Sequence, residues 1–139
     1  MASVISIDGV LLPNKTQSNF EIVDAIKKLG VSGFRGVFVR DSLPNKPKIK
    51  ECGILNLLDS SGNGTHWVAW HKRKDKNYCF DRFGIQTPIE LVRYLRSPIL
   101  FNTEKIQGND LVFCGHLCVC VLKEMALGRD LQEILNDLH

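Results

Sequence analysis

The chain of 139 residues is long enough for one domain with one core and too short for two ordinary domains. Its composition, 44% hydrophobic and 24% charged, excludes a disordered tail and a fibre, and its net charge of +3 is too small to indicate a dedicated nucleic-acid-binding protein, although it permits weak attraction to DNA. No apolar run approaches the roughly 18 residues that cross a bilayer, and the first residues lack the basic segment of a secretory signal, so we expect no membrane association.

The predicted elements begin with an N-terminal extension, residues 1–17, in which residues 3–12 alternate well enough to form an edge strand. Residues 18–29 predict an amphipathic helix that opens on a capping box of Ser18 and Glu21 and stops at Gly30. Its apolar stripe comprises Phe20, Ile22, Val23, Ile26 and Leu29.

Short strands follow this helix. Residues 36–40 and 54–58 are apolar and β-prone, and the loop between them contains Pro44 and Pro47, which cannot donate to a strand ladder.

A β-hairpin is predicted next, because two aromatic runs, residues 66–71 and 78–83, flank a charged turn. We place the turn centre between Arg73 and Lys74, where the polar residues gather, so that position 66 pairs with position 81. The basic residues between positions 71 and 76 are interpreted as a solvated turn.

Helices dominate the remainder. Thr87 and Pro88 predict the N-cap and the first position of a helix that ends near Pro98, with Glu90 completing a capping box. Residues 99–106 are expected to be extended.

Two further helices are predicted near the end, from Cys114 to about residue 127, stopped by Gly128, and from 130 to 138. The apolar face of the first comprises Leu117, Cys118, Val121, Leu122 and Met125. Few strands in mixed order with helices indicate the α+β class.

The cysteines, at positions 52, 79, 114, 118 and 120, are odd in number and clustered. The disulfide framework of a secreted domain has an even number at wider spacing. We therefore expect mostly free thiols and an intracellular, reducing compartment.

Cys114 is the candidate nucleophile. It lies at the N-terminus of its predicted helix, four residues before Cys118. Unpaired amides and the helix dipole favour a thiolate at such a position, which is how a nucleophilic cysteine is activated. Gly115 would leave room for a substrate backbone beside the sulfur.

His66 is the candidate base. Among the other histidines, His139 is terminal, His71 borders the charged turn, and His116 lies roughly 200° around the helix from Cys114. His66 instead begins a hydrophobic strand, which a fold could bring across to the cysteine.

Asp81 and Gln107 complete the candidate site. Asp81 is a carboxylate within an aromatic strand, and the assumed hairpin brings it within reach of the His66 ring, where it would hold one tautomer. Gln107, seven residues before Cys114, could donate its amide to a developing oxyanion.

Each of these residues also has a structural interpretation. A cysteine on a helix face is more often a small core residue, and Asp81 could simply pair with Arg82. Zinc is the chemical alternative, although two of the cysteines concerned lie roughly 160° apart around the helix. The cluster in question is Cys114, His116, Cys118 and Cys120, with Cys79 or Cys52 as a further ligand.

The sequence resembles the adenovirus-type cysteine protease family (adenain), and most of all the shorter proteases of virus-like DNA transposons and related viruses. The resemblance runs from about Asn19 to Leu122. It rests on Gly64-Thr-His-Trp67, on Tyr78-Cys-Phe-Asp-Arg-Phe-Gly84, and on a Gln-x₆-Cys-Gly spacing that ends at Gly115.

This resemblance implies a papain-like fold with a central mixed sheet flanked by helices, spanning residues 18–139 as one protease domain. By matching positions it assigns His66 as base, Asp81 as orienting acid, Gln107 as oxyanion donor and Cys114 as nucleophile. Trp67 would flank the cleft or pack in the sheet, and we count it with Gly64 and Gly115 as substrate-binding. Family members cut near small residues during maturation of capsid and core proteins.

Three departures from the family matter. Asp81 replaces the usual Glu of adenoviral enzymes and matches proteases that remove ubiquitin-like modifiers after Gly-Gly. The long C-terminal part of adenoviral proteases is missing, and their activators, a disulfide-linked viral peptide and DNA, cannot be carried over residue by residue. The sequence shows no required cofactor and leaves a peptide or DNA activator open.

The expected protein is therefore a monomeric cysteine endopeptidase acting on protein or peptide substrates in the host nucleus, the cytoplasm or a virion. The alternatives are a protease that removes ubiquitin-like modifiers and a non-catalytic binding module on the same fold.

Overall fold

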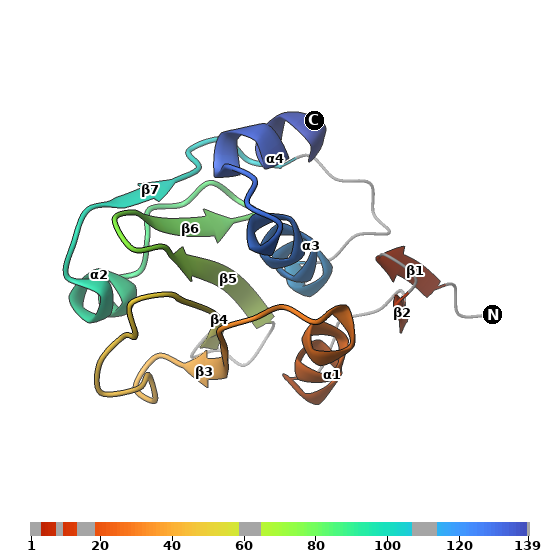
Figure 1. Cartoon of the computed structure of the whole chain (residues 1–139), viewed down its shortest axis with the longest axis horizontal. Coiled ribbons are helices and arrows are strands. Elements are labelled where there is room, and N and C mark those ends of the chain that lie inside the picture. Colours follow the sequence, from red (N-terminus) through yellow and green to blue (C-terminus); the bar gives the residue numbers. More distant parts are fainter. Residues whose placement is uncertain (1–3, 8–9, 14–18, 59–64, 107–113, 139) are drawn as a thin grey trace.

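A five-stranded mixed sheet forms the centre of the structure, and helices cover both of its faces (Figure 1). The computed structural model describes residues 4–7, 10–13, 19–58, 65–106 and 114–138. The sheet has the order β3 (Phe34–Val39), β4 (Glu51–Leu58), β5 (Thr65–Lys72), β6 (Asn77–Asp81) and β7 (Ile99–Phe101). The helices are α1 (Asn19–Leu29), α2 (Ile89–Leu95), α3 (Cys114–Ala126) and α4 (Leu131–Leu138). The predicted α+β class is confirmed.

The middle of the sheet is antiparallel and its two edges are parallel. Strand β5 pairs antiparallel with β4 and with β6, whereas β3 runs parallel to β4 and β7 runs parallel to β6. Both parallel pairs join segments that are separated along the chain by a loop or by α2, as a parallel connection requires.

Alternation along the strands divides the buried residues into two cores. Trp67 and Ala69 of β5 face α1, α3 and α4, while Val68 and Trp70 face α2. Both faces are covered, so β6 is buried along its whole length.

Helix α1 buries Ile22 and Ile26 and ends at Gly30, whose φ of 69° supplies the left-handed residue that commonly follows a helix. The predicted stripe is wrong at Phe20, which is 88% exposed. Phe20 lies two residues before Ile22, about 200° around the helix, and therefore points away from the sheet.

The hairpin of β5 and β6 forms where it is predicted, but its register differs by two residues. Asp81 pairs with Val68 instead of position 66, because the turn is centred between Lys74 and Asp75. A shift of two keeps every side chain on the expected face, since side chains along a strand alternate with a period of two.

The interpretation of the basic residues between positions 71 and 76 as a solvated turn is wrong at Arg73, which packs against the protein. Its guanidinium lies 5.0 Å from the centre of the Tyr78 ring and donates to the carbonyls of Met125 and Arg129 at the end of α3. Only the tip of the turn is exposed. The hairpin thereby caps a helix on the α3 side of the sheet.

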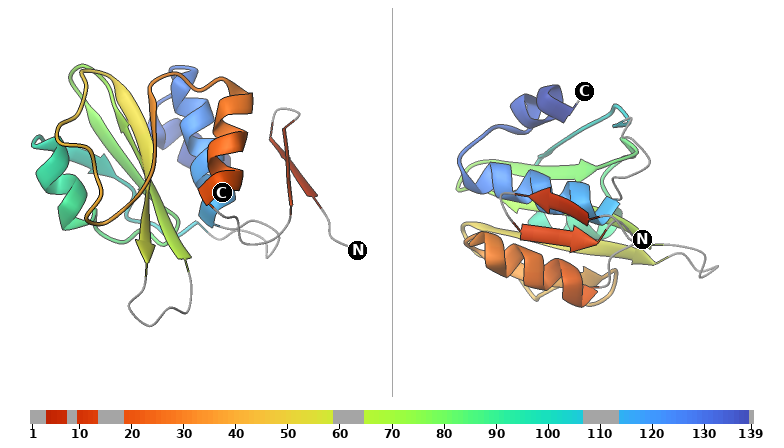
Figure 2. Two further views of the ribbon diagram at one scale, coloured as in Figure 1. Left: turned by 90° about the horizontal axis from the view of Figure 1, so that it is seen from below. Right: turned by 90° about the vertical axis from the view of Figure 1, so that its right-hand side faces the viewer.

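The N-terminal segment does not add an edge strand to the main sheet. Strands β1 (Val4–Ile7) and β2 (Val10–Pro13) pair with each other in a separate two-stranded sheet, beside α1 (Figure 2). The prediction of a single strand is therefore wrong at this point, because Ile5 pairs with Leu12 and Ile7 with Val10, so the two halves of the segment lie against each other.

Helix α2 begins differently from its prediction. Pro88 itself occupies the N-cap position, with no side-chain cap, and Glu90 pairs with Arg40 at 3.0 Å instead of completing a capping box. The extended segment expected at residues 99–106 pairs only over its first three residues. Among the helices that the structure describes, none combines the length and apolarity needed to cross a membrane.

Candidate active site

His66 and Asp81 are in direct contact. His66 Nε2 lies 2.9 Å from Asp81 Oδ1, and the side chains are 26% and 3% exposed. His66 stands near the start of β5 and Asp81 ends β6, so the two are diagonal neighbours on the α2 face of the sheet. The acid is thus buried while the ring remains open to a reactant.

Asp81 Oδ1 is held by a second donor, the backbone N–H of Phe83 at 2.8 Å. This is an Asx turn, and Gly84 follows it with a φ of 67°. The Phe83 ring packs edge-on against His66, with centroids 5.2 Å apart. Backbone and side chain of one residue therefore orient both the acid and the imidazole.

The hydrogen bond selects which nitrogen of His66 can act as a base. An ionised carboxylate only accepts, so Nε2 carries the proton that it shares with Asp81, and Nδ1 has the free lone pair. Histidine placed by a carboxylate in this way is the acid–base unit of many nucleophilic enzymes.

The start of α3 lies at the same end of the sheet as the start of β5 (Figure 2). Cys114 is the first residue of this helix, which is the expected place for an activated thiol. The side chain of Cys114 lies outside the described part of the chain, as do Gln107 and Gly64.

Gly115 and Trp67 explain how the helix reaches this position. A Cβ at Gly115 would lie 3.0 Å from Ile22 Cδ1 and 3.5 Å from Trp67 Cε3, so the glycine lets α3 approach α1 and β5 closely. Gly115 is buried, and Trp67 is 2% exposed within the core. Both residues thus pack protein against protein, which agrees with the structural interpretation of Trp67 instead of a direct substrate contact.

The other histidines that the structure describes, His71 and His116, are less suited to act as a base. His116 is 1% exposed on α3. Burial, and secondarily the charge of Arg73, lowers the pKa of His71 to about 4. His71 therefore stays neutral near pH 7, and it lies near the opposite end of β5 from His66.

The other cysteines behave as core residues. Burial raises the pKa of Cys52 and of Cys79 to about 12, which suppresses their thiolates. Cys118 is buried and its Sγ lies 3.4 Å from the Trp67 carbonyl, while Cys120 is partly exposed. These four cysteines are reduced and not disulfide-bonded.

The zinc alternative finds no support among the side chains that the structure describes, where no group of three or more His, Cys, Asp or Glu residues could hold a metal ion. Cys118 and Cys120 point to different sides of α3, one into the core and one to the helix surface.

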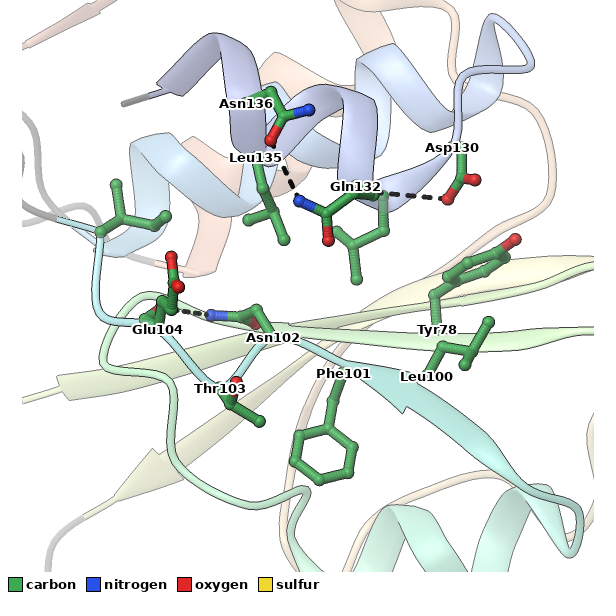
Figure 3. A pocket seen from close by; sticks show the side chains of 12 residues that line it. Tyr78, Leu100, Phe101, Asn102, Thr103, Glu104, Asp130, Gln132, Leu135 and Asn136 are labelled. Atoms are coloured by element: carbon green, nitrogen blue, oxygen red, sulfur yellow. Dashed lines mark hydrogen bonds between the residues drawn. The ribbon is translucent and has the colours of Figure 1, made fainter.

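A cavity of about 400 Å³ lies between Tyr78 of β6, residues 100–106 and α4 (Figure 3). Asn102 and Glu104 belong to its lower wall, and Gln132 and Asn136 to its upper wall. Asn102 also bonds to the backbone of Asp81, so this wall is continuous with the candidate site.

Sequence reasoning did not identify Phe83 and Asn102. The Asp-x-Phe-Gly order is a recognisable Asx-turn signal and could have indicated the first. Asn102 is one polar residue after a short apolar strand, a pattern with no specificity.

No protein-family model matches the chain, and no curated protein matches it.

Proposed function

We propose that this protein is a cysteine endopeptidase that cleaves peptide bonds next to small residues, with Cys114 as nucleophile. The observation that carries the proposal is the 2.9 Å bond between His66 Nε2 and a nearly buried Asp81 carboxylate, at the end of the sheet where α3 begins with a cysteine. The resemblance to adenovirus-type proteases, and the papain-like fold that it implies, support the same assignment.

The reaction would proceed in two steps. His66 Nδ1 accepts the Cys114 proton, the thiolate attacks the peptide carbonyl carbon, and the imidazolium returns the proton to the departing amine. Water, activated by the same nitrogen, then hydrolyses the thioester and restores the thiol. Asp81 stabilises the imidazolium, and Gln107 and the Cys114 amide would donate to the oxyanion.

The first test uses covalent probes. We expect peptide vinyl sulfones ending in Gly-Gly or Gly-Ala to add one equivalent to the protein, located at Cys114 by mass spectrometry. Cys114→Ala should abolish labelling, and His66→Ala should reduce it by about 10²-fold or more, since general acid–base catalysis contributes about 10²- to 10⁴-fold.

The matched control is Cys120→Ala, because Cys120 is the partly exposed thiol on the same helix and should be irrelevant to the reaction. Labelling of the parent protein that survives Cys114→Ala but not Cys120→Ala would contradict the assignment, as would no labelling at all. Equal reaction with a ubiquitin-like protein carrying a C-terminal vinyl sulfone would favour deconjugation as the activity.

A further inference from the structure

The backbone of Asp81 is held by a side chain, the buried amide of Asn102. The ladder between β6 and β7 ends at the pair of Cys79 and Phe101, two residues before Asp81. Beyond that point, Asp81 N donates to Asn102 Oδ1 at 2.9 Å, and Asn102 Nδ2 donates to the Asp81 carbonyl at 2.6 Å. The amide thus stands where the next peptide group of a strand would be.

Both the oxygen and the nitrogen of the Asn102 side-chain amide are hydrogen-bonded. Its oxygen accepts from Asp81, and its nitrogen donates to the carbonyls of Asp81 and of Glu104, the latter at 3.1 Å. The residue is only 4% exposed. A carboxylate at this position could not donate, and an apolar side chain would leave buried backbone groups unpaired, so the pattern is specific for an amide.

The segment around Asn102 is itself fastened to the turn after β6. Ile106 N donates to the Arg82 carbonyl at 2.8 Å, and a Cβ at Gly84 would lie 2.7 Å from the Thr103 carbonyl oxygen. The Asp81 carbonyl also accepts from Gly84 N at 2.9 Å. Asp81 is therefore fixed at its backbone from the β7 side and at its carboxylate by Phe83.

We infer that Asn102 is a positioning residue for the acid–base pair: it holds the Asp81 backbone so that the carboxylate meets His66 Nε2. This inference rests on the proposed function for its consequence in catalysis. A displacement of ~1 Å at such a group can cost ~10²-fold in rate, so the amide acts on the reaction through Asp81 without touching substrate.

Asn102→Ala and the isosteric Asn102→Asp test the inference. The first removes all three bonds, and the second keeps the acceptor for Asp81 N–H and loses both donors. In ¹⁵N-histidine spectra at pH 8, assigned with His66→Ala, we expect both variants to lose part of the Nε2–H tautomer of His66. Probe labelling should slow by about 10- to 100-fold.

Asn77→Ala is the matched control. Asn77 is a comparably buried amide, 3% exposed, at the other end of β6, where it donates to Ser97 Oγ at 2.9 Å. Its loss should lower the melting temperature like the loss of Asn102, yet leave the His66 tautomer and the labelling rate unchanged.

The outcomes separate the two proposals. Because the tautomer is read without any reaction, spectra recorded in a Cys114→Ala background test the positioning role even if labelling fails. A folded Asn102 variant with unchanged His66 signals and rate overturns the inference. Loss of folding in both Asn102 variants, with Asn77→Ala folded, also overturns it, because the amide would then be purely structural.

Discussion

Glu51 is a buried carboxylate that gathers four donors at the start of β4. Arg35 Nη1 and the Lys48 amide donate to Oε1 at 2.7 and 2.8 Å, and Trp70 Nε1 and the Tyr94 hydroxyl donate to Oε2 at 2.9 and 2.7 Å. The charge is therefore both paired and fully hydrogen-bonded, as burial requires. Burial and the bond to Glu51 raise the pKa of Tyr94 above its usual value.

Glu51→Gln should lower the free energy of unfolding by about 2–4 kcal/mol, because an amide NH₂ would face donors and leave Arg35 without its counter-charge. Urea unfolding measures the change. The control is Glu90→Gln, in an exposed pair with Arg40, which should cost at most about 1 kcal/mol. Equal losses in the two variants would contradict the structural role of Glu51.

His71 should make stability depend on pH. Its folded pKa of about 4 lies below the ordinary 6.5, so the unfolded chain binds the proton more readily. The contribution is complete above pH 6.5 and is lost as the pH falls towards about 4. His71→Gln should therefore lose less stability than the parent between pH 7 and pH 5, measured by urea midpoints. Parallel losses in the two proteins would rule out this linkage.

At the residue level, the sequence predicted the contact between Asp81 and His66 but did not indicate the role of Glu51. Asp81 stood out as a charge inside an aromatic run, which indicated a partner. Glu51 adjoins a proline-containing loop, where a charge is ordinary, and its four donors come from distant parts of the chain. The sequence pattern around Glu51 cannot show that donors from distant parts of the chain meet at this carboxylate.

At one point of the pairing between β4 and β5, a glycine of β4 makes room for a large side chain of β5. Gly53 is paired with Trp70, and a Cβ at Gly53 would lie 2.3 Å from Trp70 Cη2. The indole occupies this space and packs against Tyr94 and Phe38, with ring centroids 5.8 and 6.1 Å away. The core beneath α2 thus depends on a glycine in the neighbouring strand.

Gly53→Ala should cost about 1–3 kcal/mol through overpacking and change the near-ultraviolet circular dichroism, because Trp70 must move. Gly30→Ala is the control. It meets no atom within 4 Å but has a φ of 69°, so it should cost about 1–2 kcal/mol with an unchanged spectrum. An unaltered aromatic spectrum in Gly53→Ala would contradict the tight contact.

For the elements, local pattern predicted type better than register. The hairpin was recognisable from alternation, but its turn centre depends on which charged residues reach the tip. Arg73 does not reach it, because its guanidinium donates to the Met125 carbonyl of α3. The N-terminal strands show the same limit: alternation over residues 3–12 does not say where the chain reverses. Burial of one helix face was predictable, except where Phe20 lies off the stripe.

At the scale of the whole molecule, the α+β class followed from the mixed order of elements, whereas the parallel edges of the sheet did not. Strands β3 and β7 join it through contacts remote in sequence, which no local pattern encodes. The candidate pair of His66 and Asp81 was predictable because Asp81 is a charge within an aromatic run and His66 begins the neighbouring strand of the predicted hairpin. Asn102 was not, because an amide after a strand is common.

The sheet also separates the two hydrophobic cores of the protein. The strand residues Val68 and Cys79, two positions from His66 and Asp81, belong to the core beneath α2, whereas α3, which begins at Cys114, packs into the opposite core. Under the proposed function, substitutions in the core beneath α2 would change the support of the acid–base pair with little effect on the packing of α3, and substitutions in the opposite core would do the reverse. During divergence of proteins with this fold, the acid–base pair and the helix that carries the proposed nucleophile could therefore change independently.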